Sequence, residues 1–277
     1  MRILVSGRGI PGRKGWSNAE CLVRGFKKLG HDAHVYGNVY ESDDPIDQYS
    51  PATGCIKPDL LVWTECNDGD PQYSELLDLD CPRVIWDFDT SMHEEFSRWL
   101  WTKFGRVYVA NPNYRRDATY LPYGVDETLY YPGEQVNDVA IVGTPFKERV
   151  EFAAKAGVEL VQGLYGEAYA AFLRSLKIGV HHHDSGGEGL LVARVWETMA
   201  SGSVLVTHDN LSIRRHFTPG INVVLYDSPW DCRRRVEALL NDDEGRKNIA
   251  QNGYSEVLRR HTWTARARRI VADAGAL

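Results

Sequence analysis

Short apolar runs alternate with segments of helical periodicity along almost the whole chain. The apolar runs have the length of buried strands and occupy residues 3–6, 33–36, 60–63, 84–86, 107–110, 139–142, 159–161, 178–181, 204–207 and 223–226. Between them, helical patterns cover residues 18–29, 94–101, 147–156, 167–176, 191–200 and 232–240. Strands that alternate with helices are typical of parallel sheets with helices on both faces. The pattern therefore predicts an α/β protein.

This alternation is interrupted once, over residues 121–137, where Pro, Gly and polar residues follow no clear period. Strand-like runs precede and follow this segment, so we expect two Rossmann-like domains that face each other across a cleft. The expected domains are residues 1–130 and 131–262, and a helical pattern over residues 263–277 is expected to pack back on the first domain. Open parallel sheets bind ligands at the carboxyl ends of their strands, so the loops after the strands are the expected sites.

Composition narrows the class of protein further. The 277 residues are 43% hydrophobic and 25% charged, which is globular composition, and the net charge of −6 argues against a protein that coats nucleic acid. The first residues read as a strand and not as a signal peptide, and no apolar run reaches the ~18–20 residues of a membrane span. The five cysteines are scattered and lack the close pairs of a zinc site. We therefore expect reduced thiols, a cytoplasmic location and no membrane segment.

A glycine-rich loop, residues 7–15, follows the first strand and precedes the first helix. Glycines allow a ligand to approach the backbone closely, and a helix N-terminus attracts anions, so Gly9 and Gly12 are candidate donor-binding residues. The loop matches neither the dinucleotide fingerprint nor the phosphate-binding P-loop. Its alternative interpretation is a plain strand-to-helix connection, with Ser17 or Asn18 as the helix N-cap.

A second glycine-rich turn is the most informative feature of the chain. It follows the strand that ends in three histidines, and we expect a helix to begin after it near Gly189. The free backbone N–H groups at the start of this helix, including those of Gly189 and Leu190, suit a diphosphate. Arg194 lies further along this helix and could add a charge-assisted hydrogen bond. Glu197 lies on the same face and could accept from the two hydroxyls of a ribose. The alternative is an ordinary amphipathic helix with an intrahelical Arg-Glu pair.

The segment RVWETMASGSVLVT, residues 194–207, resembles a sequence block of the GT-B glycosyltransferases, and most closely that of their CgeB-like branch, which is related to the retaining family 4 enzymes. Further matches follow in the order of that family. They are residues 121–126 with 131–132, 138–149, 217–220 with 224–226, and 261–263. The resemblance covers the second half of the chain well and the first half loosely.

This resemblance implies a glycosyltransferase whose second domain binds a nucleoside-diphosphate sugar, linked to UDP or GDP, while the first domain binds the acceptor. In the family, the residue at Glu197 holds the ribose, and the loop of Thr144, Lys147 and Arg149 contacts the diphosphate. The loop of Tyr165 meets the nucleobase. Family 4 enzymes carry two glutamates eight positions apart, whereas Glu188 and Glu197 are nine apart here. Hexosyl transfer with retention is expected, with Glu188 reaching toward the sugar.

Candidate catalytic residues also lie after other strands. Asp87, Asp89 and His93 follow a strand of the first domain and are candidates to face the acceptor, where one could take its proton if the reaction inverts. Such an Asp-x-Asp binds a metal in a different glycosyltransferase fold, which the layout of this chain disfavours. The alternative is a strand end followed by a helix cap at residues 90–91. Adjacent residues on a strand point to opposite faces, so the three successive histidines do not easily bind one zinc ion. His183 or Asp184 is expected instead near the transferred sugar.

The sequence thus predicts a sugar transferase that requires no metal or other cofactor. Its acceptor is open among a saccharide, a protein and a modified DNA base such as a hydroxymethylated one, and nucleic acid is expected only in that role. Two alternatives stay open. One is a nucleotide-sugar epimerase of the same fold, and the other is a non-catalytic protein that binds a nucleotide sugar.

Overall fold

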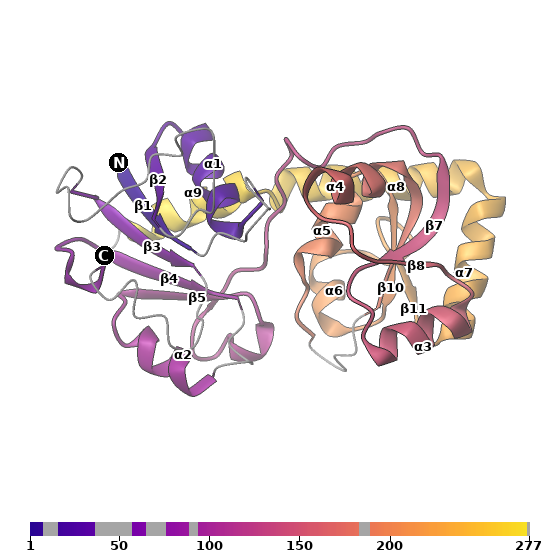
Figure 1. Ribbon diagram of the computed structural model, residues 1–277, viewed down its shortest axis with the longest axis horizontal. Helices are drawn as coiled ribbons and strands as arrows, with labels where there is room; N and C mark the ends of the chain where they lie inside the picture. The colour runs from indigo at the N-terminus through magenta and orange to yellow at the C-terminus, as the bar shows by residue number, and fades with distance from the viewer. Residues whose placement is uncertain (8–15, 37–56, 65–75, 89–93, 183–188, 276–277) are drawn as a thin grey trace. The chain divides into compact units, whose positions relative to one another are not determined.

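The computed structural model describes residues 1–7, 16–36, 57–64, 76–88, 94–182 and 189–275. The chain divides into two compact units (Figure 1). Unit 1 consists of Met1–Pro122 together with Trp263–Leu277, and unit 2 of Tyr123–Thr262. Each unit is built on one parallel sheet covered by helices, so the predicted α/β class with two Rossmann-like domains is confirmed. The division after Pro122 falls inside the segment that interrupts the sequence pattern.

The sheet of unit 1 has the strand order β2-β1-β3-β4-β5-β6. Its strands are β1 (Arg2–Ser6), β2 (Asp32–Tyr36), β3 (Leu60–Thr64), β4 (Arg83–Asp87), β5 (Arg106–Val109) and β6 (Thr119–Tyr120). All neighbouring pairs are parallel. The sequence pattern missed β6, because a strand of two residues has no period to detect.

Helices α1 (Asn18–Lys28) and α9 (Trp263–Ala274) pack against each other in unit 1, although they come from opposite ends of the chain. At their contact, a Cβ added to Gly25 would lie 2.8 Å from the backbone oxygen of Trp263, so only glycine permits this approach. Helix α1 begins with a capping box between Ser17 and Glu20, as the cap prediction expected. Helix α2 (Glu94–Trp101) adds Leu100 and Trp101 to a core cluster with strand residues, and a 3₁₀ turn follows at Pro112–Tyr114.

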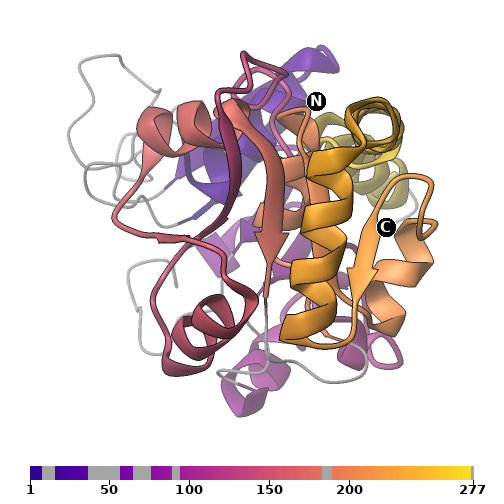
Figure 2. The same cartoon turned by 90° about the vertical axis from the view of Figure 1, so that its right-hand side faces the viewer.

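Unit 2 contains a five-stranded sheet of order β11-β10-β9-β7-β8. The strands are β7 (Asn137–Val142), β8 (Leu160–Val161), β9 (Leu176–His181), β10 (Val204–His208) and β11 (Val224–Tyr226). The helices are α3 (Lys147–Ala156), α4 (Gly166–Ser175), α5 (Ala193–Ala200), α6 (Leu211–His216), α7 (Pro229–Asn241) and α8 (Asp243–Arg260). Helices α3 and α7 pack together, while α5 packs on α4 and α8. Figure 2 shows unit 2 from the side on which α7, in orange, faces the viewer. The helices thus lie in two groups around the sheet.

A buried apolar cluster fills the space between the sheet of unit 2 and the α3–α7 pair. It combines β-branched strand residues such as Ile178, Val180 and Val206 with Phe152 and Val236 of the helices. Fully burying one such side chain stabilises the fold by roughly 1.5–3 kcal/mol. The core therefore holds the carboxyl ends of the strands in place.

Three helices differ from the sequence prediction. Helix α5 begins at Ala193 and not near Gly189, because Val192 has an extended backbone (φ −69°, ψ 161°). The pattern missed α6, which has six residues, and α8, which is mostly polar and has two interior glycines. Their N-caps, Asn210 and Asp242, each accept a backbone hydrogen bond and define the starts of these helices. In the described part of the chain, no helix is both long and apolar enough to cross a membrane.

Candidate functional site

The strand order of unit 2 places a switch point between β7 and β9. The chain leaves β7 for β8 on one side of the sheet, and later returns to β9 on the other side of β7. Gly143 follows β7 and His182 follows β9 at the carboxyl edge of the sheet. Open parallel sheets bind their ligands at such a point, so the residues around Gly143 and His182 form the candidate site.

Arg149 of α3 connects the two strand ends. Its Nη1 donates to the backbone oxygen of Thr144 at 2.5 Å, and its Nε and Nη2 both lie 3.4 Å from the backbone oxygen of His182. The residue is only 7% exposed, and its guanidinium lies 5.3 Å from the centre of the Phe146 ring. The sheet edge therefore holds a guanidinium in a fixed orientation.

Arg194 of α5 reaches the same place. A Cβ added to Gly143 would lie 2.9 Å from Nη2 of Arg194 and 3.1 Å from Nη1 of Arg149, so the two guanidinium groups meet above this glycine. Burial lowers the pKa of Arg149, and the neighbouring charge of Arg194 lowers it further. Nε of Arg194 is buried and has no hydrogen-bond partner among the described residues, while the side chain bonds to Tyr169.

No carboxylate lies within ion-pair distance of Arg149 or Arg194 among the residues that the structure describes. The charges of Arg194 and Glu197 act on each other without forming an ion pair. The two neighbouring cations repel each other, so an anion bound between them would stabilise both. Helix α3 begins beside them at Lys147, and Phe146 provides no side-chain cap for its first amides. Thr144 and Lys147 are exposed on this rim. The arrangement has the chemistry of an anion site at a helix N-terminus.

Glu197 lies one turn after Arg194 on α5. Its Oε2 accepts a hydrogen bond of 2.7 Å from the hydroxyl of Tyr169, and the Tyr130 hydroxyl also bonds to the carboxylate. Burial raises the pKa of Glu197, while the two tyrosines and the charge of Arg194 act in the opposite direction. In the described chain no Arg194–Glu197 ion pair is formed, so the carboxylate is held by tyrosines and not by an intrahelical salt bridge.

The other donor-side candidates lie around this centre or outside the described residues. Gly189 is buried and Leu190 partly buried, but both precede α5 by several residues, so their amides are not those of its first turn as the sequence predicted. Tyr165 is 56% exposed at the N-cap position of α4 and gives no capping hydrogen bond. Gly9, Gly12, Asp89, His93, His183, Asp184 and Glu188 lie outside the described residues.

Asp87 is the one acceptor-side candidate that the structure describes. It is fully buried at the end of β4, where Oδ2 accepts from the Trp101 indole at 3.0 Å and Oδ1 has no hydrogen-bond partner. This contact attaches α2 to the sheet of unit 1.

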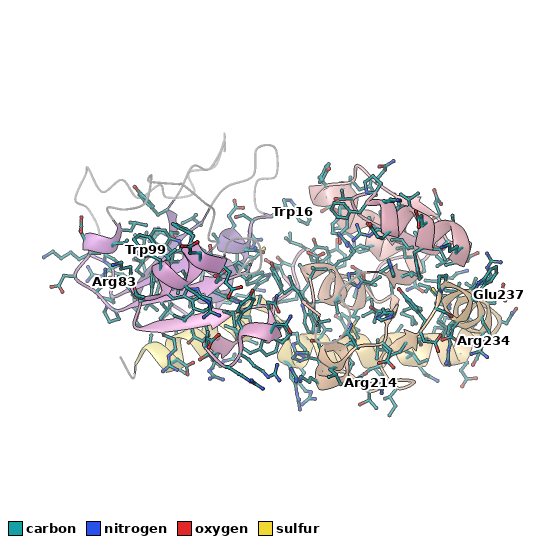
Figure 3. All side chains as sticks on the ribbon, turned by 90° about the horizontal axis from the view of Figure 1, so that it is seen from below. Trp16, Arg83, Trp99, Arg214, Arg234 and Glu237 are labelled. Atoms are coloured by element: carbon teal, nitrogen blue, oxygen red, sulfur yellow. The ribbon has the colours of Figure 1, made fainter. Side chains whose placement is uncertain are left out.

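Trp99, on the same helix, points outward and is 52% exposed (Figure 3). Trp16, which precedes the Ser17 cap, is partly buried.

Three residues of this centre were not singled out from the sequence: Gly143, Tyr130 and Tyr169. Tyr169 lies on α4 four positions after Tyr165, the N-cap residue that the sequence had singled out, and this closeness in sequence was the available signal. Gly143 stands in the 138–149 match, and its φ of +146° explains why glycine is needed there. Nothing in the irregular segment before β7 pointed to Tyr130.

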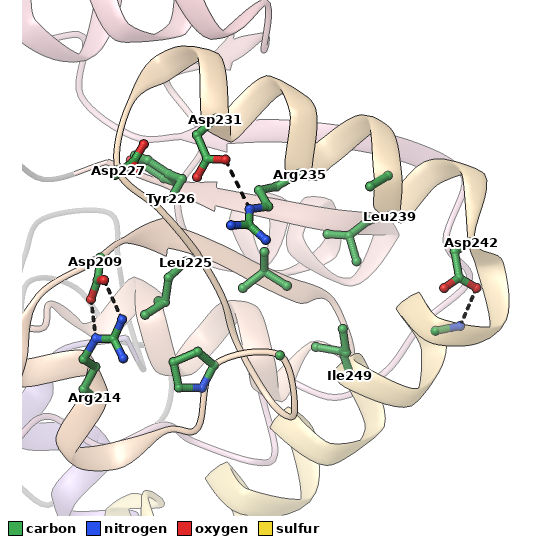
Figure 4. A pocket seen from close by; sticks show the side chains of 15 residues that line it. Asp209, Arg214, Leu225, Tyr226, Asp227, Asp231, Arg235, Leu239, Asp242 and Ile249 are labelled. Atoms are coloured by element: carbon green, nitrogen blue, oxygen red, sulfur yellow. Dashed lines mark hydrogen bonds and ion pairs between the residues drawn. The ribbon is translucent and has the colours of Figure 1, made fainter.

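Hollows also open on the described surface of unit 2. One, of about 240 Å³, lies beside the site and is lined by His182, His208 and Tyr226, with Phe152 stacked on His182 at 4.0 Å. A second, of about 410 Å³, is lined by α6, α7, α8 and β11 and carries the Asp209–Arg214 and Asp231–Arg235 ion pairs on its rim (Figure 4). We call Arg149, Arg194 and Gly143 the arginine centre, and the second hollow is lined by none of these residues. Within the described residues, no cluster of three or more His, Cys, Asp or Glu could hold a metal ion.

Comparison with protein families gives a match to a model described as "Glycosyl transferase-like", over residues 127–272. No curated protein matches the sequence. Among solved structures, a sucrose-phosphate synthase from Thermosynechococcus elongatus has a TM-score of 0.69 at 11% identity and covers 98% of both chains. An α-glucosyltransferase in complex with UDP and a 13-mer DNA containing an HMU base has a TM-score of 0.71 at 14% identity over 99% of both chains. HepE of Anabaena, in complex with UDP and glucose, has a TM-score of 0.69 at 11% identity over 100% of both chains.

Proposed function

This chain belongs to the glycosyl transferase-like family, and we propose from this membership that the arginine centre of unit 2 binds the donor, a nucleoside-diphosphate sugar. The observation that supports this most is the meeting of Arg149 and Arg194 above Gly143, where neither guanidinium forms an ion pair with a carboxylate of the described residues. A diphosphate presents several oxygens to donors in this arrangement, and planar guanidinium groups suit such oxygens.

The nucleoside is proposed to extend from the diphosphate along α5. Glu197 accepts from the ribose hydroxyls, since its carboxylate lies one turn from Arg194 and is oriented by Tyr169. Tyr165, exposed at the start of α4, is proposed to contact the base. Gly189, Leu190, His183 and Glu188 belong to the segment that would reach the sugar. UDP is the first donor to test, because structural neighbours contain it, and GDP is the second.

Catalysis requires that the bond from the sugar anomeric carbon to the diphosphate breaks while a bond to the acceptor oxygen forms. The leaving diphosphate gains negative charge, and Arg149 and Arg194 would stabilise it in place. The acceptor loses a proton, and in an inverting reaction Asp87, Asp89 and His93 of unit 1 are the candidates to take it. We propose transfer of a hexose with retention, on the resemblance to family 4.

The acceptor is proposed from the same three classes: a saccharide, a protein or a hydroxymethylated DNA base. A structural neighbour was solved with DNA that contains an HMU base, and this makes such DNA the first acceptor to test. A cytoplasmic location is part of the proposal, and the free thiols of Cys21, Cys81 and Cys232 are compatible with it.

The test is release of UDP from UDP-glucose by the whole protein, with and without each acceptor. We expect release that depends on the acceptor, and Arg149→Gln should lower the affinity for UDP by about 10²-fold, because a diphosphate loses a buried charge-assisted contact. Arg234→Gln is the matched control, since Arg234 lies exposed on α7 (Figure 3) and should change neither quantity.

The alternatives give different results in this experiment. Conversion of the sugar nucleotide without any acceptor would favour an epimerase. Binding of UDP-glucose with no turnover in the presence of every acceptor would favour a non-catalytic binding protein. Equal UDP affinity in Arg149→Gln and the parent would contradict the proposed donor site.

A further inference from the structure

The Glu197 carboxylate is held by two phenols that come from different parts of unit 2. Tyr169 lies on α4, whereas Tyr130 lies in the segment before β7. Their rings are edge to face, with centroids 6.2 Å apart and an interplanar angle of 78°. Tyr130 is 5% exposed. Both hydroxyls bond to Glu197, so the carboxylate is fixed at a junction of α4, α5 and the segment before β7.

From this geometry we infer that Tyr169 and Tyr130 are positioning residues that make the donor site select ribose over sugars without vicinal hydroxyls. The inference rests on the proposed function, in which Glu197 receives the ribose. Both residues contact Glu197 and would act on the sugar of the nucleoside through this carboxylate. Tyr169 also bonds to the Arg194 side chain, so its loss would reach the diphosphate contact as well.

The number of acceptor positions on a carboxylate supports this role. A carboxylate has about four lone-pair sites, so two phenol donors leave room for both hydroxyls of a ribose. A glutamate side chain without these bonds would sample several rotamers and would pay an entropic cost on binding. The phenols remove that cost in advance. This is the effect of orienting a binding group through a second residue.

The protonation states are also suitable. Burial raises the pKa of Tyr169 well above its ordinary value, and the charge of Glu197 raises it further, so the phenol keeps its proton and remains a donor. The hydrogen bonds from Tyr169 and Tyr130 in turn favour the ionised form of Glu197, which burial disfavours. The ionised form is the better acceptor for two hydroxyl groups.

The test compares two ligands on the whole protein. The affinities of UDP and of 2′,3′-dideoxy-UDP are measured by calorimetry for the parent, Tyr169→Phe and Tyr130→Phe, with the GDP pair used instead if GDP binds more tightly. The parent should prefer the ribonucleotide by about tenfold or more. Each variant should lose most of this preference. In Tyr130→Phe, UDP should bind about tenfold more weakly while the dideoxy compound binds as before, whereas Tyr169→Phe also loses the bond to Arg194 and should weaken both ligands, UDP the more.

Tyr131→Phe is the matched control. Tyr131 is the next residue to Tyr130, is 47% exposed, and its ring lies under the Arg174 guanidinium at 4.6 Å, a contact that phenylalanine keeps. This variant should show the preference of the parent. Thermal melting of the ligand-free variants reports whether each has kept its fold.

Two results would overturn the inference while leaving the donor site in place. One is an equal loss of affinity for both ligands in Tyr130→Phe, which a merely structural role would produce. The other is an unchanged preference in Tyr169→Phe and Tyr130→Phe. If the parent binds neither UDP nor GDP, the proposed function fails, and this inference fails with it.

Discussion

At the scale of single residues, the site consists of two guanidinium groups and a carboxylate at the carboxyl edge of one sheet. Arg149 and Arg194 meet above Gly143, and Glu197 follows one turn further along α5. The two cations are partly desolvated, which makes their interaction with an anion stronger than it would be in water. Glu197 is also removed from water, and burial raises its pKa. The anion-binding and hydroxyl-binding functions are therefore separated by position along the same helix.

The raised pKa of Glu197 predicts how ribose selectivity depends on pH. The ionised carboxylate is the stronger acceptor, so the preference for UDP over 2′,3′-dideoxy-UDP should be complete above the pKa of Glu197 and lost as the pH falls through it. Because burial raises this pKa, the loss should begin above the ordinary glutamate range near pH 4.5. Titration of both affinities by calorimetry between pH 8 and the acid limit of the fold checks this.

The ratio of the two affinities is the useful quantity, since protonation of the diphosphate affects both ligands alike. Glu197→Gln should show a small and pH-independent ratio. A ratio for the parent that stays constant with pH would contradict the role of the carboxylate.

At the scale of elements, the orientation of α5 decides where Arg194 and Glu197 lie. This helix packs on β9 at Gly179, where an added Cβ would lie 2.4 Å from Cγ2 of Thr198. Thr198 lies between Glu197 and Met199 on the buried face of α5. The close approach of helix and strand is therefore set by a glycine on one side and a β-branched residue on the other.

Gly179→Ala should destabilise the protein by about 1–3 kcal/mol, because the added methyl overpacks the contact between β9 and α5. It should also weaken UDP binding, since α5 must shift. Adding Thr198→Ser removes the clashing methyl group and should restore much of the lost stability and of the lost affinity for UDP. Denaturant melts and calorimetry of the single and double variants measure this, and a double variant no better than Gly179→Ala would argue against the packing explanation.

The sequence predicted most strands and helices because their apolar periodicity was strong, as in β9 and β10. It misplaced the start of α5, because the extended backbone of Val192 depends on the surrounding structure and not on any helix-breaking residue. It missed α8, whose hydrophobic face is weak. Arg194 and Glu197 were proposed from their spacing on the helix after the glycine-rich turn, and Arg149 was proposed through the family resemblance. The tyrosines on Glu197 were missed, because Tyr130 and Tyr169 are brought together only by the fold.

At the scale of the whole molecule, the chain crosses between the two units twice. It leaves unit 1 after Pro122 and returns to it at Trp263, so α9 completes the first unit from the far end of the sequence. Trp263 packs on Trp86 with ring centroids 5.4 Å apart. Arg266 is buried, donates to the backbone oxygen of Pro122 at 2.7 Å, and has a pKa lowered by burial to about 10. Tyr108 donates to Asp273 at 2.8 Å.

Ending the chain after Thr262 should therefore unfold unit 1 and spare unit 2. The loss exposes the faces of α1 and Trp86 that α9 covers, whereas the core of unit 2 is formed within Tyr123–Thr262. Hydrogen exchange should show unprotected amides in β1, β3 and β4 and protected amides in β9 and β10. Adding UDP should still slow the hydrogen exchange of amides in unit 2 of the truncated chain. Normal protection of β1, β3 and β4 in the truncated chain would contradict this assignment.

The most direct test of the donor site is a crystal structure of the protein with UDP. The account predicts phosphate oxygens within ~3.2 Å of the guanidinium nitrogens of Arg149 and Arg194, and ribose hydroxyls at a similar distance from the Glu197 carboxylate. A nucleotide bound elsewhere, for example in the hollow beside Asp209 and Arg214, with Arg149 and Arg194 touching no part of it, would contradict the account.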